Sequence, residues 1–252
     1  MESILNVLNE KPELKNPIMI EGLPGVGNVG KLAAEHLLEQ LDGTKFADIF
    51  SKHFPPQVLL DEDGVISLAN NELYYAKNVG NGVDVIFLIG DHQGLTPEGQ
   101  YDLAQNIIDL AQDMGVTRIY ALGGYGIGKM VEDVRVLGAV TDVEMKEDLE
   151  SHGVVFSSGE PGSGIVGASG LILGLAQIVG MEAACLMGET SGYFVDPKGA
   201  EAVCRVLCSI LGTEIDFSDL ETKAQQIDAI TSKIKEMEEA AKPGNEDLGY
   251  IG

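Results

Sequence analysis

The stretch MIEGLPGVGNVGKLAAEHLLEQL, residues 19–41, decides the fold class because it runs from an apolar strand through a glycine-dense turn into an amphipathic helix. A buried strand followed by a turn and a helix is the repeating unit of an open α/β sheet. The turn also approaches two nucleotide-binding patterns. Gly25, Gly27 and Gly30 have the dinucleotide spacing G-x-G-x-x-G, and Gly25 to Lys31 fits a P-loop up to its last position.

Leu32 occupies the position at which a P-loop carries Ser or Thr. The hydroxyl of that residue ligates Mg²⁺, so a leucine removes a metal ligand and weakens the P-loop interpretation. For the dinucleotide interpretation Asp48 stands where an acid would hold the ribose, although such a match often arises by chance. A packing role explains the same glycines: Gly25, Gly27 and Gly30 let the chain turn sharply and bring the helix close to the strand.

Strand-like apolar runs alternate with helix-periodic segments along the rest of the chain, which predicts an α/β fold with an open, mostly parallel sheet flanked by helices. Thr96 and Asp196 each precede a proline, a combination that caps and starts a helix. The expected strands are 17–21, 47–50, 83–91, 118–124, 135–142, 154–158 and 182–189, with a hairpin-like region at 57–78, and the expected helices are 29–41, 97–114, 144–151, 164–181 and 197–211.

The chain changes character after Gly212, which predicts an α/β core domain over 1–213 and a C-terminal helix with a short acidic tail over 214–252. Apolar residues recur every three or four positions over 219–241, as in an amphipathic helix. Such a stripe packs on the chain's own core or forms a seam between subunits, as in a short coiled coil.

The charge balance excludes nucleic acid as a partner, because 40 acidic residues face only 16 basic ones and the formal net charge is −24. The uncharged segment 164–181 contains five glycines and acidic flanks, so it predicts a core helix and no membrane span. The three cysteines are too few for a disulfide framework, and the N-terminus lacks a basic segment before an apolar one. We therefore expect a cytoplasmic protein, and no cofactor or metal.

Carboxylates stand at the ends of three expected strands, and in a parallel sheet these ends border the usual ligand crevice. Glu21, Asp91 and Glu189 suggest a divalent-metal site or an acid/base pair, although carboxylates at strand ends also cap neighbouring turns and helices. The candidate crevice comprises Glu21, Gly25, Gly27, Asn28, Asp91, Gln93 and Glu189.

Six segments together resemble the proteasome assembly chaperone family, in the branch that contains the eukaryotic second assembly chaperone and its archaeal relatives. They are IEGLPGVGNVGKLAAEHL (20–37), GDHQGLTPEGQY (90–101), GGYGIG (123–128), GIVGASGLILGLA (164–176), GETSGYFVDPKGAEAVCRVLCSILG (188–212) and IDFSDLETKA (215–224). The resemblance implies a phosphorylase-like α/β fold, a homo-oligomer, and binding to proteasome subunits or related protein complexes without turnover of a substrate.

Some archaeal members of that family end in a hydrophobic-Tyr-any motif that docks between α-ring subunits of the proteasome. This chain ends LGYIG, so the tyrosine is third from the end and the match is imperfect. The resemblance makes Leu248, Tyr250, Ile251 and Gly252 the expected partner-binding residues, while a tail that packs on its own oligomer is an equal alternative.

Three functions are consistent with these patterns. The first is a non-enzymatic proteasome assembly chaperone or adaptor. The second is an enzyme that holds a small ligand or metal at Glu21, Asp91 and Glu189. The third is a nucleotide-binding regulator that uses Gly25 to Lys31.

Overall fold

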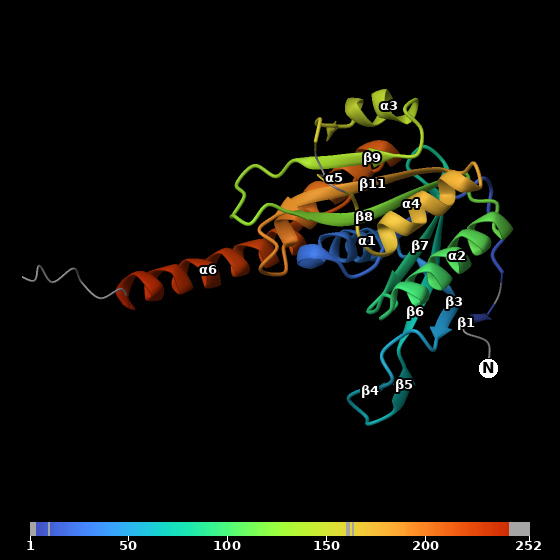
Figure 1. The fold of residues 1–252 in the computed structure, drawn as a ribbon, viewed down its shortest axis with the longest axis horizontal. Coiled ribbons are helices and arrows are strands. Elements are labelled where there is room, and N and C mark those ends of the chain that lie inside the picture. The colour runs from blue at the N-terminus through green and yellow to red at the C-terminus, as the bar shows by residue number, and fades with distance from the viewer. Residues whose placement is uncertain (1–3, 10, 160–161, 163, 242–252) are drawn as a thin grey trace, which may run out of the picture.

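In the described part of the chain, nine strands form one open sheet that carries helices on both faces (Figure 1). The computed structural model describes residues 4–9, 11–159, 162 and 164–241. The strands are β1 (Ile4–Leu8), β2 (Ile18–Gly22), β3 (Thr44–Ser51), β4 (Val58–Leu60), β5 (Ile66–Leu68), β6 (Asn70–Val79), β7 (Val83–Gly90), β8 (Arg118–Gly126), β9 (Val136–Val140), β10 (Val154–Val155) and β11 (Glu182–Thr190). The helices are η1 (Val26–Asn28, a 3₁₀ turn), α1 (Val29–Gln40), α2 (Pro97–Asp113), α3 (Met145–Ser151), α4 (Ala168–Ile178), α5 (Pro197–Leu211) and α6 (Ser218–Ala241).

The main sheet has the order β1-β3-β6-β7-β2-β8-β11-β9-β10, with parallel pairing at its centre. Strands β7, β2, β8 and β11 run parallel to one another, and β10 runs parallel to β9 at the edge. The pairs β1–β3, β3–β6, β6–β7 and β9–β11 are antiparallel. The predicted α/β class is confirmed, and the antiparallel pairs flank the parallel centre.

Two apolar cores lie on opposite faces of the sheet. Along β2, Ile18 and Ile20 contribute to the core under α1 and α5, while Met19 contributes to the core under α2 and α4. Successive residues of a strand face opposite sides, so a strand covered on both sides reads as a continuous apolar run. Every residue of β2 is buried, which explains why its run was recognisable in the sequence.

The predicted helix starts are confirmed by side-chain caps. The hydroxyl oxygen of Thr96 accepts a hydrogen bond from the Gly99 amide at 3.1 Å. A carboxylate oxygen of Asp196 accepts one from the Gly199 amide at 2.9 Å. Each cap satisfies one amide of the first helical turn, and the following proline occupies a position where no amide is needed.

Helix α6 begins at the body of the molecule and extends away from it (Figure 1). Leu220 in its first turn is buried, whereas Ile230 is 55% exposed. Among the described side chains, which end at Ile230, the stripe packs on the core at its beginning and is exposed further along, and the seam between subunits stays a prediction. The domain boundary at 213/214 stays a prediction. In the described residues no helix has both the length and the apolar character needed to cross a bilayer.

Candidate functional site

The candidate crevice lies at the carboxyl ends of β7, β2 and β8, where the chain switches from one side of β2 to the other. After β7, helix α2 carries the chain across β2 to β8. A reversal of strand order of this kind opens a crevice in α/β sheets. The strand-end residues here are the ones that the sequence singled out.

Glu21 is fully buried at the end of β2, on the face covered by α4. One carboxylate oxygen accepts a hydrogen bond from the Leu23 amide at 3.1 Å, and the other accepts one from the Ser169 hydroxyl at 3.0 Å. Burial raises the pKa of Glu21 to about 7, because desolvation disfavours the charged form more than these two hydrogen bonds favour it. Glu21 thus joins β2, the turn after it and α4.

Asp91, beyond the end of β7, forms an ion pair with Lys31 of α1. Lys31 is also 3.5 Å from the Glu35 carboxylate, one turn further along the helix. Desolvation alone would lower the pKa of Lys31, but the hydrogen bond to Asp91 and the charge of Glu35 raise it. The lysine of the P-loop-like segment is therefore held by two carboxylates of its own chain.

Glu189, near the end of β11, forms an ion pair with Arg135, which precedes β9. The Arg135 amide also donates to a Glu189 carboxylate oxygen at 3.3 Å. The hydrogen bond from the guanidinium lowers the pKa of Glu189 below its ordinary value, so this side chain is a carboxylate at neutral pH. Glu189 ties β11 to the segment that leads into β9.

The three strand-end carboxylates do not converge. The registers place Glu21 level with Leu88 in β7 and, across β8, with Cys185 in β11. At about 3.3 Å per residue, Asp91 lies roughly 10 Å and Glu189 roughly 13 Å further along their strands. Among the described residues, no three His, Cys, Asp or Glu side chains are grouped as they would be around a metal ion. Glu21, Asp91 and Glu189 therefore do not form the common site that the enzyme alternative requires.

The glycine-rich turn packs closely against the sheet. A Cβ on Gly30 would lie 2.2 Å from the Leu122 carbonyl oxygen, so α1 approaches β8 closely only because residue 30 has no side chain. Gly27 has a φ of +63°, which favours glycine. The packing interpretation is confirmed for these two positions. It is wrong for Gly25, because its backbone is extended and no atom lies within 4 Å of the Cβ position.

Gln93 and Asn28 also have local roles. The Gln93 amide nitrogen donates to the Pro24 carbonyl oxygen at 2.6 Å, and its oxygen accepts from the Ala168 amide at 3.0 Å. Gln93 therefore links the turn after β2 to the first residue of α4. Asn28 sits in the left-handed region, with a φ of +51°, at the start of α1. Its side chain makes no capping hydrogen bond to that helix.

Adding Mg-ATP or NAD at millimolar concentration should leave the melting temperature unchanged. Lys31 is already paired with carboxylates, and Leu32 cannot ligate Mg²⁺. A ligand at 100 times its dissociation constant would add about 2.7 kcal/mol. Differential scanning fluorimetry would register that as a rise of roughly 5–10 °C for a chain of this size, and such a rise would contradict the packing interpretation.

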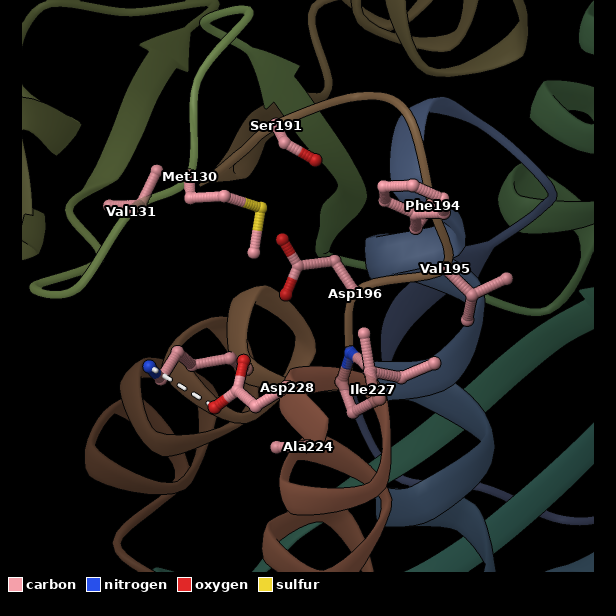
Figure 2. Close-up of a pocket in the computed structure, with 11 residues that line it drawn as sticks. Met130, Val131, Ser191, Phe194, Val195, Asp196, Ala224, Ile227 and Asp228 are labelled. Atoms are coloured by element: carbon pink, nitrogen blue, oxygen red, sulfur yellow. Dashed lines mark ion pairs between the residues drawn. The ribbon is translucent and has the colours of Figure 1, made fainter. Parts of the chain in front are cut away.

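A small cavity of about 30 Å³ marks the joint between α6 and the body (Figure 2). It is lined by Met130 of the β8–β9 segment, Phe194 and Asp196 of the β11–α5 segment, and Ile227 of α6. Ligand pockets span about 300–1,000 Å³, so this cavity is too small for a nucleotide. The Lys198–Asp228 ion pair at 4.0 Å borders it and connects α5 to α6.

An apolar surface adjoins this joint, and the sequence pattern did not single it out. Tyr193, Phe194 and Val195 are 71%, 44% and 44% exposed, and Met130 is 42% exposed. The signal present in the sequence was the apolar run YFV directly before the Asp-Pro helix start, in a segment too short for a strand. Exposed apolar residues that cluster in this way are typical of protein-binding surfaces.

Comparison with known proteins places this chain in a family. A family model described as PAC2 matches residues 19–235. The chain belongs to the PAC2 family. The resemblance to proteasome assembly chaperones inferred from the sequence motifs is thereby confirmed, since the PAC2 relatives include archaeal homologues of those chaperones.

Several relatives match this PAC2-family chain over nearly its whole length. The crystal structure of PbaB from Pyrococcus furiosus, an archaeal proteasome activator, is 38% identical with a TM-score of 0.88, and the match covers 93% of this chain and 100% of PbaB. PbaA of the same organism, an archaeal homologue of proteasome-assembly chaperone, is 31% identical with a TM-score of 0.77 over 95% and 94% of the two chains. The uncharacterized protein MJ1210 of Methanocaldococcus jannaschii is 42% identical over 95% of this chain and 93% of its own length.

The expected partner-binding residues Leu248, Tyr250, Ile251 and Gly252 lie outside the described residues, so their role stays a prediction. Three of the crevice residues, Glu21, Gln93 and Gly27, belong to the turn after β2 or contact it. Asp91 and Glu189 each form an ion pair elsewhere. These residues form structural contacts between neighbouring elements, and a ligand crevice at this place stays a prediction.

Proposed function

We propose that this PAC2-family chain is a non-enzymatic chaperone or adaptor for proteasome-type complexes, and that it acts through protein–protein contacts as a cytoplasmic homo-oligomer. The similarity to PbaB carries the proposal, because 38% identity extends over 93% of this chain with a TM-score of 0.88. The pairing of Asp91 with Lys31 and of Glu189 with Arg135 supports a binding role over catalysis.

The C-terminal helix supplies the contact in this proposal. Helix α6 is anchored to the body at its first turns: Arg205 of α5 reaches Glu221 at 3.3 Å and lies over the Phe217 ring at 4.0 Å. Beyond that anchor the helix points away from the sheet (Figure 1). A projecting helix presents its far end to a partner without obstruction from the body.

Deleting residues 248–252 should abolish capture of purified proteasome α-rings by this chain. Docking of Tyr250 and Ile251 in a groove would bury apolar area that offsets the ordering of a short segment. The measurement is a pull-down with tagged chain, and circular dichroism verifies that the deletion leaves the fold intact.

A matched control replaces Asn245 by alanine, upstream of the apolar residues, and should retain capture. Equal capture by the deleted chain would defeat the tail assignment while leaving the adaptor role open. If the full-length chain itself captures no α-rings, the adaptor role is wrong.

A second candidate within the same class is activation of the assembled proteasome. The greater similarity to PbaB than to PbaA, 38% against 31% identity, favours it. Stimulated hydrolysis of a fluorogenic peptide by the complete core particle would indicate activation. Faster appearance of complete particles from isolated subunits, with no stimulation of hydrolysis, would indicate assembly.

A further inference from the structure

Helices α2 and α4 lie side by side on one face of the sheet, and a groove runs between their first turns (Figure 1). The groove has a volume of about 420 Å³. Leu95 and Tyr101 line it on the α2 side, and Val166, Gly170 and Leu171 line it on the α4 side. None of the described residues that line the groove is charged, although the chain carries a formal net charge of −24.

The outward side of α4 continues this uncharged surface. Gly170, Gly174 and Ile178 follow one another at intervals of four residues, so they lie on one side of the helix. The opposite side of the helix is buried, at Ala168, Ile172 and Ala176. No charged residue occurs over 164–181. The groove and the outward side of α4 together form a surface that we call the α4 face.

Gly174 has no packing role within the described chain. It lies in the middle of α4, where glycine is a poor helix former. A Cβ on Gly170 would lie 2.2 Å from the Ile165 carbonyl oxygen, whereas a Cβ on Gly174 would have no described atom within 4 Å. Internal contacts therefore explain Gly170 but not Gly174. Close approach of a second backbone is a reason for glycine at such a position.

The α4 face exposes enough apolar surface for a specific interface. Leu95, Tyr101, Val166 and Ile178 are 63%, 56%, 96% and 80% exposed, which amounts to on the order of 500 Å². The face also includes five exposed or partly exposed residues, which raise its area to roughly 700 Å²: Ile165, Leu171, Gly174, Leu175 and Gln177. Two such faces would bury up to about 1,400 Å², and specific interfaces begin at about 1,200 Å².

A second copy fits the α4 face because one two-fold axis relates its protruding side chain to its groove. When two α4 helices pack antiparallel with Gly174 at the axis, residue 178 of one copy lies opposite residue 170 of the other. Ile178 protrudes, and Gly170 lines the groove. Each copy then inserts Ile178 into the groove of its partner. A self-complementary surface of this kind produces a closed dimer.

Electrostatics favour a second copy over a basic partner at this surface. Two copies of a chain with a net charge of −24 repel one another, and an uncharged interface adds no contact between like charges. A basic partner would instead be held by carboxylates, which the α4 face lacks. The acids that flank Tyr101 in sequence, Glu98 and Asp102, belong to α2, and Asp102 already lies 3.1 Å from His53 Nε2.

We propose that the α4 face is an interface between two copies of this chain, with their α4 helices antiparallel about a two-fold axis near Gly174. The proposal gives a surface to the homo-oligomer named under the proposed function, and it rests on the proposed function in that respect.

The first test compares molar masses by size-exclusion chromatography with light scattering at several concentrations of the full chain. Ile178→Glu should lower the mass by a factor of two, because it places a carboxylate in each apolar groove. The matched control is Leu60→Glu, since Leu60 is 70% exposed on the β4–β5 hairpin, away from α4 (Figure 1). This control should keep the wild-type mass, and circular dichroism verifies the fold of both variants.

Two outcomes of this test would overturn the proposal. One is a wild-type chain that is monomeric at about 100 μM, a concentration at which micromolar affinity would populate the dimer. The other is an Ile178→Glu chain with the wild-type mass.

The second test addresses the antiparallel arrangement. A cysteine at a two-fold axis faces its own copy, so mild oxidation of Gly174→Cys should give a covalent dimer on a non-reducing gel. The three native cysteines are buried and do not compete. Glu39→Cys, exposed on α1 at the other face of the sheet, should give no covalent dimer. Gly174→Cys chains that remain uncoupled would overturn the antiparallel arrangement.

Capture of proteasome α-rings separates this proposal from the proposed function. Monomeric Ile178→Glu that still captures α-rings would support the interface and leave the adaptor role intact. An Ile178→Glu chain of unchanged mass that no longer captures α-rings would assign the α4 face to that partner and overturn the interface. A wild-type dimer that captures no α-rings would support the interface and contradict only the adaptor role.

Discussion

Replacing Glu21 by glutamine should stabilise the protein at pH 8 by about 3 kcal/mol and remove a pH dependence that the wild type shows between pH 4.5 and 8. The pKa of Glu21 rises from an ordinary 4.5 to about 7 in the folded chain. Each pKa unit corresponds to about 1.4 kcal/mol, so ionising this buried carboxyl costs a few kcal/mol. Glutamine has the same shape, keeps an acceptor for the Leu23 amide, and carries no charge.

The direction of the effect comes from proton linkage. The folded chain binds the Glu21 proton more tightly than the unfolded chain, so protonation favours folding. The stabilisation is fully present below pH 4.5 and is lost as the pH rises through about 7. Urea unfolding at a series of pH values measures it, and the two proteins should converge near pH 4.

Glu189→Gln is the matched control, because its pKa is shifted in the opposite direction. The pairing with Arg135 lowers the pKa of Glu189, so its ionised form stabilises the fold. This variant should therefore be destabilised at neutral pH, and the difference from wild type should fade as the pH drops into the acidic range. Two parallel stability–pH profiles for the Glu21→Gln variant and wild type would contradict the assignment of the raised pKa.

A buried carboxyl with a pKa near 7 is often a functional group, but here its contacts indicate a structural one. Glu21 receives hydrogen bonds from the turn after β2 and from Ser169 of α4, so it ties together two elements that Gln93 also connects. These contacts position α1 and α4 at the end of the sheet. Glu21→Gln should accordingly leave α-ring capture unchanged.

The sequence predicted elements whose signals are local. The caps at Thr96 and Asp196 lie three residues from the amides they satisfy, and the apolar run of β2 reflects burial on both faces. Strand β1 escaped prediction because it is a short antiparallel edge strand that pairs only with β3. The parallel centre was predictable from the alternation of strands and helices, whereas the antiparallel flanks were not.

The candidate site was harder to predict because its contacts span long separations in sequence. Lys31 and Asp91 are 60 residues apart, and Arg135 and Glu189 are 54 apart. Strand-end position alone grouped Glu21, Asp91 and Glu189, but the register separates them along their strands. Similarly, the hairpin-like region expected at 57–78 is a hairpin only over β4 and β5, whereas β6 joins the main sheet. Only the register assigned four apolar side chains of that hairpin to one exposed face.

Gly30→Ala should destabilise the protein by about 3 kcal/mol or more, the upper range for forcing extra atoms into a packed interior. Gly30 lies in the first turn of α1, where alanine is the better helix former, so any loss must come from tertiary contact. The new methyl group would lie 2.2 Å from the Leu122 carbonyl oxygen and 2.9 Å from the Gly123 amide nitrogen. Both are backbone atoms of β8, a strand of the parallel centre of the sheet, so neither can rotate away.

Gly25→Ala, five residues earlier in the glycine-rich turn, is the matched control for the packing effect of Gly30→Ala. Its Cβ position has no atom within 4 Å, and its backbone is extended, so stability should change by less than about 0.5 kcal/mol. Thermal unfolding should thus show a fall of roughly 6–12 °C for Gly30→Ala and almost none for Gly25→Ala. A Gly30→Ala protein as stable as wild type would mean that α1 moves freely off β8, and the turn would then lose its packing explanation.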